Sequence, residues 1–158
     1  MTVRPLMIAP QVMAVDIQPY IGYVGASQTF KEGSPLILTA QQLVIAVTAP
    51  ASGSPILVGM AAQDAPTVEG AAMAYYPFIP GLVLEATLAG AASAALTLAK
   101  ATHFQLPVGL TLVAATGFWY ADTSATSCCT IIGFRDADGT NHARVYIVLD
   151  MDVTVYNN

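Results

Sequence analysis

The stretch IIGFRDADGTNHARVYIVL, residues 131–149, decides the fold class of this chain. Its two ends are rich in apolar and β-branched residues, and Asp138-Gly139 lies between them. Glycine accepts a positive φ angle without steric cost, so this dipeptide favours a tight turn. After the turn every second residue is apolar and lies on one face of a strand, namely Val145, Ile147 and Leu149. We therefore predict a β-hairpin, and because its other face is also fairly apolar, we expect cover on both sides.

Short runs rich in valine, isoleucine, threonine and tyrosine recur along the rest of the chain. Ten prolines and twelve glycines, together with serine and aspartate, bound most of them. The runs are PYIGYVGA, SPLILTA, LVIAVTA, SPILVGMAA, LVLEATL, CCTIIGF and RVYIVLDMDVTVY. Several short strands with frequent turns are typical of β-sandwiches and barrels. The predicted fold class is mainly β, with short antiparallel strands in a barrel or sandwich and little helix.

Helix is expected in two places at most. Residues 65–76 have room for one or two helical turns. Residues 90–104 contain good helix formers in alanine, leucine and lysine, but Ser93, Thr97 and Thr102 oppose them. Helix and irregular structure therefore both remain open for this second segment.

A break in the chain lies near residue 75, where the sequence AMAYYPFIPG supplies two prolines and a glycine. We predict an N-terminal β-rich module with an extended arm over residues 1–74 and a C-terminal β-barrel or sandwich over residues 75–158. A single barrel built from both halves remains the alternative. No exact internal repeat accompanies the division.

The composition excludes several classes of protein. Hydrophobic residues make up 55% of the 158 and charged residues 9%, against about 25% charged in typical soluble domains. No apolar run reaches the roughly 20 residues that a membrane-spanning helix needs, so we predict no membrane segment. Five lysines and arginines, in a chain of net charge −5, form no basic stripe for nucleic acid. We expect the excess apolar surface to meet protein, either copies of this chain or a larger assembly.

Cys128 and Cys129 are the only cysteines and are adjacent. Neighbouring side chains on a strand point to opposite faces, so the two thiols diverge, and a disulfide between them would distort the backbone. A zinc site needs about four ligands, and only His103 and His142 could add ring nitrogens. We interpret both thiols as packed within a sheet and predict neither a metal nor a cofactor.

The turn around Asp138 offers two further chemical interpretations. Asp136 and Asp138 open like a calcium loop, but the glycine comes two positions too early and Ile147 replaces the closing glutamate. His142 could act as a base, yet no nucleophile is marked beside it. We therefore predict a turn without catalytic function.

Carboxylate pairs could serve a glycosidase. The candidates are Asp122 with Glu85 and Asp150 with Asp152. Charged residues at solvated strand edges are the commoner use of such side chains. We predict that the chain is not an enzyme and assign no catalytic residue.

The sequence GFWYAD is the best candidate for a binding site. An exposed Trp119 and Tyr120 could stack on a sugar ring. A lone tryptophan in a β domain more often packs in the core, which is the favoured interpretation.

Residues 20–65 contain an F-x-x-G-x-P turn at Phe30, Gly33 and Pro35, followed some twenty residues later by ILVGMA, residues 56–61. These features resemble the opening module of capsid decoration (cement) proteins of tailed bacteriophages. The second half resembles the run of strands in the same group at FIPGLVLEATLAG (residues 78–90), GFWYADTSATSCCTIIGFRDADG (117–139) and ARVYIVL (143–149). The double cysteine and the alanine-rich centre depart from the pattern.

The resemblance implies a virion structural protein that is made in the host cytoplasm and docks on the exterior of the expanded phage capsid. It would bind as a homotrimer, bridge adjacent major capsid proteins, and carry no catalytic residues. Two alternatives remain. One is a glycan- or receptor-binding β module of a head fibre or adhesin, which requires Trp119 and Tyr120 to be exposed. The other is a different assembly subunit, such as a tail or shell protein.

Overall fold

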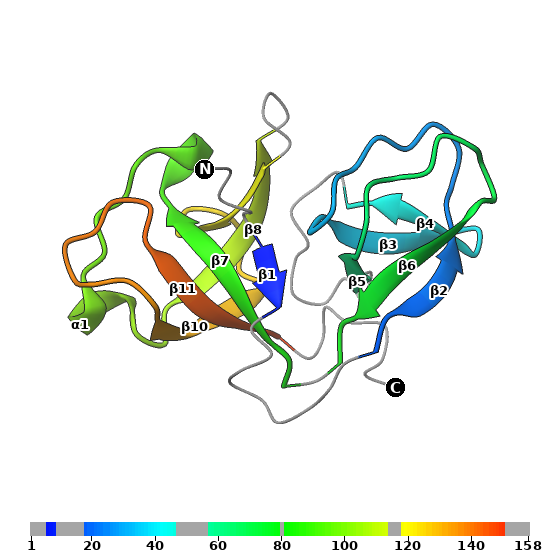
Figure 1. The fold of residues 1–158 in the computed structure, drawn as a ribbon. Helices are drawn as coiled ribbons and strands as arrows, with labels where there is room; N and C mark the ends of the chain where they lie inside the picture. The colour runs from blue at the N-terminus through cyan, green and yellow to red at the C-terminus, as the bar shows by residue number, and fades with distance from the viewer. Residues whose placement is uncertain (1–5, 9–17, 47–56, 80, 114–117, 151–158) are drawn as a thin grey trace.

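A computed structural model describes residues 6–8, 18–46, 57–79, 81–113 and 118–150. Within these ranges the chain forms eleven strands, one 3-10 turn and one four-residue helix, so the predicted mainly β fold is confirmed (Figure 1). The elements are β1 (Leu6–Ile8), β2 (Tyr20–Tyr23), β3 (Pro35–Thr39), β4 (Gln42–Ile45), β5 (Leu57–Ala61), β6 (Ala72–Pro77), β7 (Val83–Ala89), η1 (Ala91–Ser93), α1 (Lys100–His103), β8 (Pro107–Val113), β9 (Phe118–Asp122), β10 (Cys129–Phe134) and β11 (Arg144–Leu149).

The first sheet has the order β2-β6-β5-β3-β4, and every pairing along it is antiparallel. Its two ends meet, because Val24, just after β2, bridges Leu43 of β4 in a parallel sense. The amide of Gly25 donates to the carbonyl of Leu43 over 2.9 Å. The sheet is therefore a small barrel closed at one point.

The second sheet has the order β7-β11-β10-β8-β9, with β1 added beside β7. Here too the ends meet, because β9 pairs with β7 in parallel through Ala121 opposite Leu88 and Asp122 opposite Ala89. The remaining length of that edge of β7 is covered by β1, which pairs antiparallel with residues 84–86. The second barrel is thus closed partly by its own third strand and partly by the N-terminal strand.

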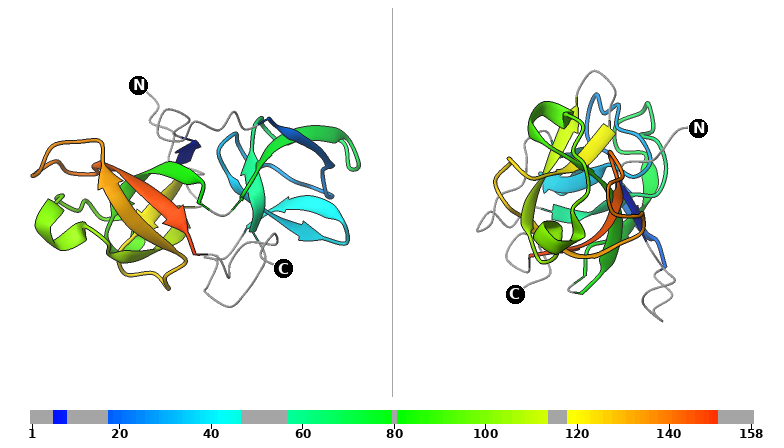
Figure 2. Two further views of the ribbon diagram at one scale, coloured as in Figure 1. Left: turned by 90° about the horizontal axis from the view of Figure 1, so that it is seen from below. Right: turned by 90° about the vertical axis from the view of Figure 1, so that its left-hand side faces the viewer.

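The two barrels have the same strand order. Numbered within each barrel, the order is first, fifth, fourth, second, third, with the third strand returning to the first in parallel. A glycine of the fourth strand faces an aromatic ring of the fifth in both: a Cβ added at Gly59 would lie 2.6 Å from Tyr75, and one at Gly133 would lie 3.3 Å from Tyr146. The chain therefore contains a structural duplication that shows no exact repeat in its sequence. The two barrels lie side by side (Figure 2).

Strands β2 to β6, which end at Pro77, pair within the first barrel, and strands β7 to β11, which begin at Val83, pair within the second. The predicted module boundary at residue 75 falls inside β6, which pairs with β2 and β5 of the first barrel. In the other direction, β1 belongs by sequence to the N-terminal half but pairs with the second barrel.

The core reflects this arrangement. One cluster of buried side chains fills the first barrel and includes Val24, Phe30 and Leu36. A larger cluster fills the second barrel and also takes in Leu57 and Met60 from β5 of the first. Strand β5 is buried at all five positions because its side chains divide between the two clusters. The two barrels therefore share apolar packing.

The hairpin predicted over residues 131–149 is confirmed, with β10 and β11 paired from Cys129 opposite Leu149 to Phe134 opposite Val145. Asp138-Gly139 does form a turn, but it lies within a longer loop over residues 135–143 and does not join the strands directly. The inner face of β11 is fully buried, as its alternation indicated. The expected cover on both sides is wrong at Ile132, which is 40% exposed on the outer face. A register shift between Ile131 and Gly133 adds a bulge there.

Both candidate helical segments are mostly irregular or extended. In residues 90–104 the helical parts are η1 and the four residues of α1. Between them Thr97 forms a bridge with Asn141, so pairing with the hairpin loop overrides the helix propensity of the alanines. Residues 65–71 form an irregular stretch with bends and a turn, and β6 follows directly.

The β3–β4 turn generates a stability prediction. Ala40 and Gln41 form its two-residue loop with φ angles of 48° and 67°. Two positive φ angles define a type I′ turn, for which Asn-Gly is preferred. We expect the double variant Ala40→Asn, Gln41→Gly to raise the free energy of unfolding by about 1 kcal/mol, measured by urea denaturation.

The matched control, Gly139→Ala, should lower the free energy of unfolding. Gly139 has a φ of 81°, and the space that a Cβ would occupy there is open, so Gly139→Ala should cost about 1 kcal/mol through the backbone alone. A double variant less stable than the parent chain would contradict the type I′ assignment.

Candidate functional site

The two adjacent cysteines are both free and fully buried. Cys129 begins β10, opposite Leu149 on one side and Val108 on the other. Its thiol donates to the carbonyl oxygen of Val108 over 3.3 Å. Both thiols belong to the apolar cluster of the second barrel, so the predicted packing is confirmed. The predicted divergence of the two thiols is wrong, because Cys128 precedes the strand and its side chain lies in the same cluster as that of Cys129.

The chemistry of Cys129 is that of an inert thiol. A side-chain hydrogen bond with Cys128 raises the pKa of Cys129 well above the ordinary value of 9.0, and burial raises it further. The negative charge of Asp150 acts in the same direction. Because the thiolate is the nucleophile and the metal ligand, these surroundings suppress both uses.

Trp119 does not offer a stacking surface. It is the largest fully buried side chain, with 1% of its area exposed, and it belongs to the core of the second barrel. Tyr120 points to the other face of β9, is half-buried, and has its ring 6.1 Å from that of His142. The core interpretation of Trp119 is therefore confirmed, and the sugar-stacking interpretation is wrong for this residue.

The carboxylates of the turn that was compared with a calcium loop are bound within the protein. Asp136 accepts three hydrogen bonds from Arg144, and Asp138 accepts one from the backbone amide of Lys100 over 2.8 Å. These contacts tie the loop to β11 and to the start of α1. Within the described residues no three histidine, cysteine or acidic side chains cluster closely enough to hold a metal ion.

The remaining catalytic candidates are dispersed. His142 is exposed, and His103 accepts a hydrogen bond at Nδ1 from the amide of Ala99. Ser124 donates its hydroxyl to Asp122 over 2.7 Å, which fixes a local turn. No nucleophile, base and orienting acid converge among these residues.

Of the two carboxylate pairs considered for glycoside chemistry, Glu85 and Asp122 each bind another partner. Glu85 binds Arg135 and Asp122 binds Ser124, so each is occupied separately. Asp150 accepts a long hydrogen bond of 3.4 Å from Thr130, and Asp152 lies outside the described residues.

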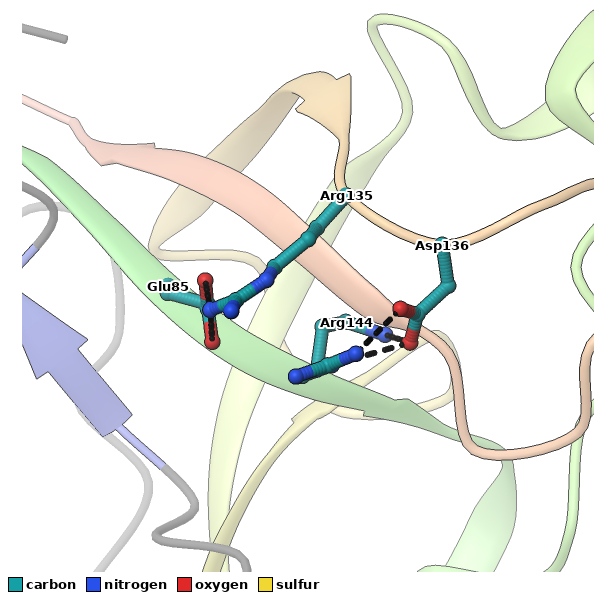
Figure 3. Close-up of polar contacts among 4 residues, drawn as sticks. All are labelled: Glu85, Arg135, Asp136 and Arg144. Atoms are coloured by element: carbon teal, nitrogen blue, oxygen red, sulfur yellow. Dashed lines mark hydrogen bonds and ion pairs between the residues drawn. The ribbon is translucent and has the colours of Figure 1, made fainter. Parts of the chain in front are cut away.

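The strongest polar arrangement is a pair of ion pairs on the outer face of the second barrel (Figure 3). Arg135 donates Nη1 to both carboxylate oxygens of Glu85, at 2.9 and 2.6 Å. Arg144 donates its backbone amide, Nε and Nη2 to Asp136, at 2.8, 3.0 and 2.6 Å. Arg135 and Asp136 are adjacent where β10 ends, so the two pairs fasten that end to β7 and β11.

The consequence for titration is clearest at Asp136. Hydrogen bonds from the Arg144 side chain lower the pKa of Asp136 below its ordinary value of 3.8. The cluster was missed from the sequence, although a lone Glu85 within an apolar strand was a signal, because buried carboxylates require a partner. The sequence pattern could not identify Arg135 as the partner of Glu85, because the two residues are fifty positions apart.

The other notable surface feature is apolar. Eight large apolar side chains are exposed among the described residues: Tyr20, Ile21, Tyr23, Leu38, Val68, Ile79, Phe104 and Ile132. Three of these eight lie on the four-residue strand β2. Lone exposed apolar residues are normal, but a group on one strand indicates a surface that meets protein.

No family model matches the chain, and no curated protein aligns with it significantly. Among the described helices, none is both long and apolar enough to cross a membrane.

The buried thiols generate a reactivity prediction. In the native protein Cys128 and Cys129 should react with Ellman's reagent at least about 100-fold more slowly than in guanidinium chloride, because reaction requires opening of the core. The release of thionitrobenzoate measures the rate. The variant Thr67→Cys places a thiol at an exposed bend and should react at once. Rapid native titration of a thiol in the parent chain would contradict the burial.

The Asp136–Arg144 pair generates a pH-dependent prediction. Since the folded pKa of Asp136 is lowered, its contribution to stability is present above the unfolded pKa and is lost as the pH falls through the folded value. Asp136→Asn should cost about 1–2 kcal/mol of unfolding free energy at pH 7, allowing for the partial exposure of Arg144. As the pH falls through the lowered folded pKa of Asp136, the variant and the parent should converge. Denaturant titrations across this range measure the difference.

Asp64 supplies the control. Its ion pair with Lys31 is exposed, so Asp64→Asn should change stability by less than about 0.5 kcal/mol at any pH. An equal loss from both variants, or a loss at Asp136 that persists at pH 2, would refute the assignment.

Proposed function

We propose that this chain is a virion structural protein: a capsid decoration (cement) protein of a tailed bacteriophage. It binds the outer surface of the head and stabilises contacts between major capsid proteins. The observation that carries the proposal is the exposure of eight large apolar side chains on a chain with 9% charged residues. The F-x-x-G-x-P turn and the strands that resemble this group supply the specific identity.

The internal use of charge supports an interfacial role. Arg135 and Arg144, two of the five basic residues, bind carboxylates of the same chain. Lys31 is engaged with Asp64 as well. These charged side chains would otherwise hydrate the surface, and the internal ion pairs partly neutralise them. Apolar contact therefore contributes more to binding another protein.

The fold suits a protein that acts by contact. Two closed barrels joined by a shared core present a rigid surface, and rigid partners lose little conformational entropy when they bind. Apolar burial contributes about 25 cal/mol per Å², and a standard interface buries about 1,600 Å². Much of this gain is offset by the entropy of association, but many copies on one symmetric shell bind with avidity.

The proposal includes self-association as a homotrimer on the capsid exterior, with the major capsid protein as the second partner. Three-fold positions between capsid subunits present three equivalent surfaces, which a trimer matches by symmetry. Burial of Trp119 weighs against the sugar-binding alternative, since the proposed stacking platform is inside the core.

Reconstitution tests the proposal. Purified protein is mixed with expanded, undecorated heads of the phage whose genome encodes it, and bound protein is measured by sedimentation and located by cryo-electron microscopy. We expect saturable binding at symmetric positions and a higher temperature of DNA release. Unexpanded heads serve as the control. Failure to saturate expanded heads at about 10 μM, far above the dissociation constants of specific complexes, would refute the proposal.

Two exposed apolar residues identify the docking half. Val68→Lys alters the first barrel and Ile132→Lys the second, and neither should disturb folding because both side chains are exposed. The variant on the docking face should bind at least about 10-fold more weakly, since a charge is buried at an apolar contact.

A further inference from the structure

The structural duplication gives β2 and β7 equivalent places, since each is the first strand of its barrel. On one side, β2 pairs with β6 as β7 pairs with β11. On the other side, each meets the third strand of its barrel in parallel near its C-terminal end, at Val24 for the first barrel and at Leu88 for the second. The edge that precedes this contact can therefore be compared between the barrels.

The two equivalent edges differ in what covers them. In the second barrel, β1 pairs antiparallel with residues 84–86 of β7. In the first barrel, residues 20–23 pair with β6 and have no second strand beside them within the described part of the chain. Among the described residues, no strand covers the edge of β2 that corresponds to the β1 position.

Burial also differs between the two strands. All seven residues of β7 are buried. In β2, by contrast, Tyr20, Ile21 and Tyr23 are 55%, 65% and 58% exposed. Alternation places Ile21 and Tyr23 on the outer face, while Gly22 lies over Leu43 on the inner face. The same position in the same fold is therefore fully covered in one barrel and largely exposed in the other.

The β2 edge lacks the charged protection against strand addition. Natural edge strands carry lysine, other charges, proline or a bulge that prevents pairing, or are very short. β2 is short and Pro19 precedes it, but residues 20–23 contain no charge, proline or bulge, and no charged residue occurs over residues 17–30. An incoming strand would meet neither repulsion nor an obstructing side-chain charge.

We propose that a second copy of this chain pairs its own β2 with this edge, antiparallel and across a two-fold axis. A two-fold axis makes two copies of one strand antiparallel, which is the sense in which β1 covers β7. The contact is self-complementary: uncharged residues meet uncharged residues, although each copy carries a net charge of −5. A strongly basic partner strand would gain nothing at this neutral edge.

The two-fold contact brings equivalent side chains together. Ile21 and Tyr23 of one copy lie on the same outer face as Ile21 and Tyr23 of the other, and pairs of aromatic and β-branched residues stabilise adjacent strands. Backbone hydrogen bonds join the two barrels into one sheet. A pair of four-residue strands is small beside the roughly 1,200 Å² of a stable interface, so the association is reversible and depends on concentration.

This inference does not rest on the capsid proposal. A two-fold contact through β2 predicts an even number of copies, and it can join two trimers as readily as two single chains.

Sedimentation velocity over a range of protein concentrations provides the first test. We expect the mass of the full-length chain at high concentration to be an even multiple of 16.4 kDa. Ile21→Lys should halve that mass, with self-association at least about 10-fold weaker, because two like charges then face each other across the pair. Ile132→Lys is the matched control: it adds a lysine to an exposed position of the second barrel and should leave the mass unchanged.

Cross-linking provides the second test. Cys128 and Cys129 are buried, so a new surface thiol dominates oxidation of the folded protein. Under mild oxidation Ile21→Cys should give a covalent dimer, because a residue near the centre of the strand lies close to its own copy across the axis. Ile132→Cys should remain single-chain. Thermal unfolding measurements establish that each variant retains the fold.

The outcomes separate clearly. A halved mass in Ile21→Lys together with the Ile21→Cys dimer supports the contact. A single-chain mass at all concentrations, or a trimeric mass unchanged by Ile21→Lys, overturns it. Binding to phage heads by a chain that fails these tests would leave the capsid proposal intact and refute the two-fold contact alone.

Discussion

Closure of each sheet by its first strand is the constraint on which the rest of this structure depends. Five short strands form a barrel when the third strand returns to pair in parallel with the first, and this happens at Val24–Leu43 and again at Leu88–Ala121. Closure removes most of the unpaired strand edges and encloses one apolar interior in each barrel. Shared packing through Leu57 and Met60 then holds the barrels together.

Several of the few charged side chains form ion pairs within the protein. The ionic side chains of the second barrel are used to fasten the hairpin loop, with Arg135 bound to Glu85 and Arg144 to Asp136. The thiols and the tryptophan are enclosed in the core. These groups are therefore committed to architecture.

The duplication allows the edge of the first strand to be compared between the two barrels. In the second barrel the short parallel contact is extended by β1 along residues 84–86, and all seven residues of its first strand are buried. In the first barrel the equivalent edge keeps its exposed tyrosines and isoleucine. A single fold thus provides a covered and an uncovered version of the same edge. The difference arises because one N-terminal strand pairs with only one of the two barrels.

The sequence by itself determined the local part of this structure. Alternation at Val145, Ile147 and Leu149 with a turn at Asp138-Gly139 established the hairpin, and the lack of partner ligands indicated that both cysteines are packed. Alternation alone was wrong about their direction, because both thiols lie in one cluster. Only the tertiary structure decided which strands become neighbours across the chain. A period of two indicates the face on which a residue lies but not its partner, so barrel closure, the fifty-residue span from Glu85 to Arg135 and the open edge of β2 were beyond the pattern. The duplication was hidden for the same reason, because strand order is a property of contacts between distant segments.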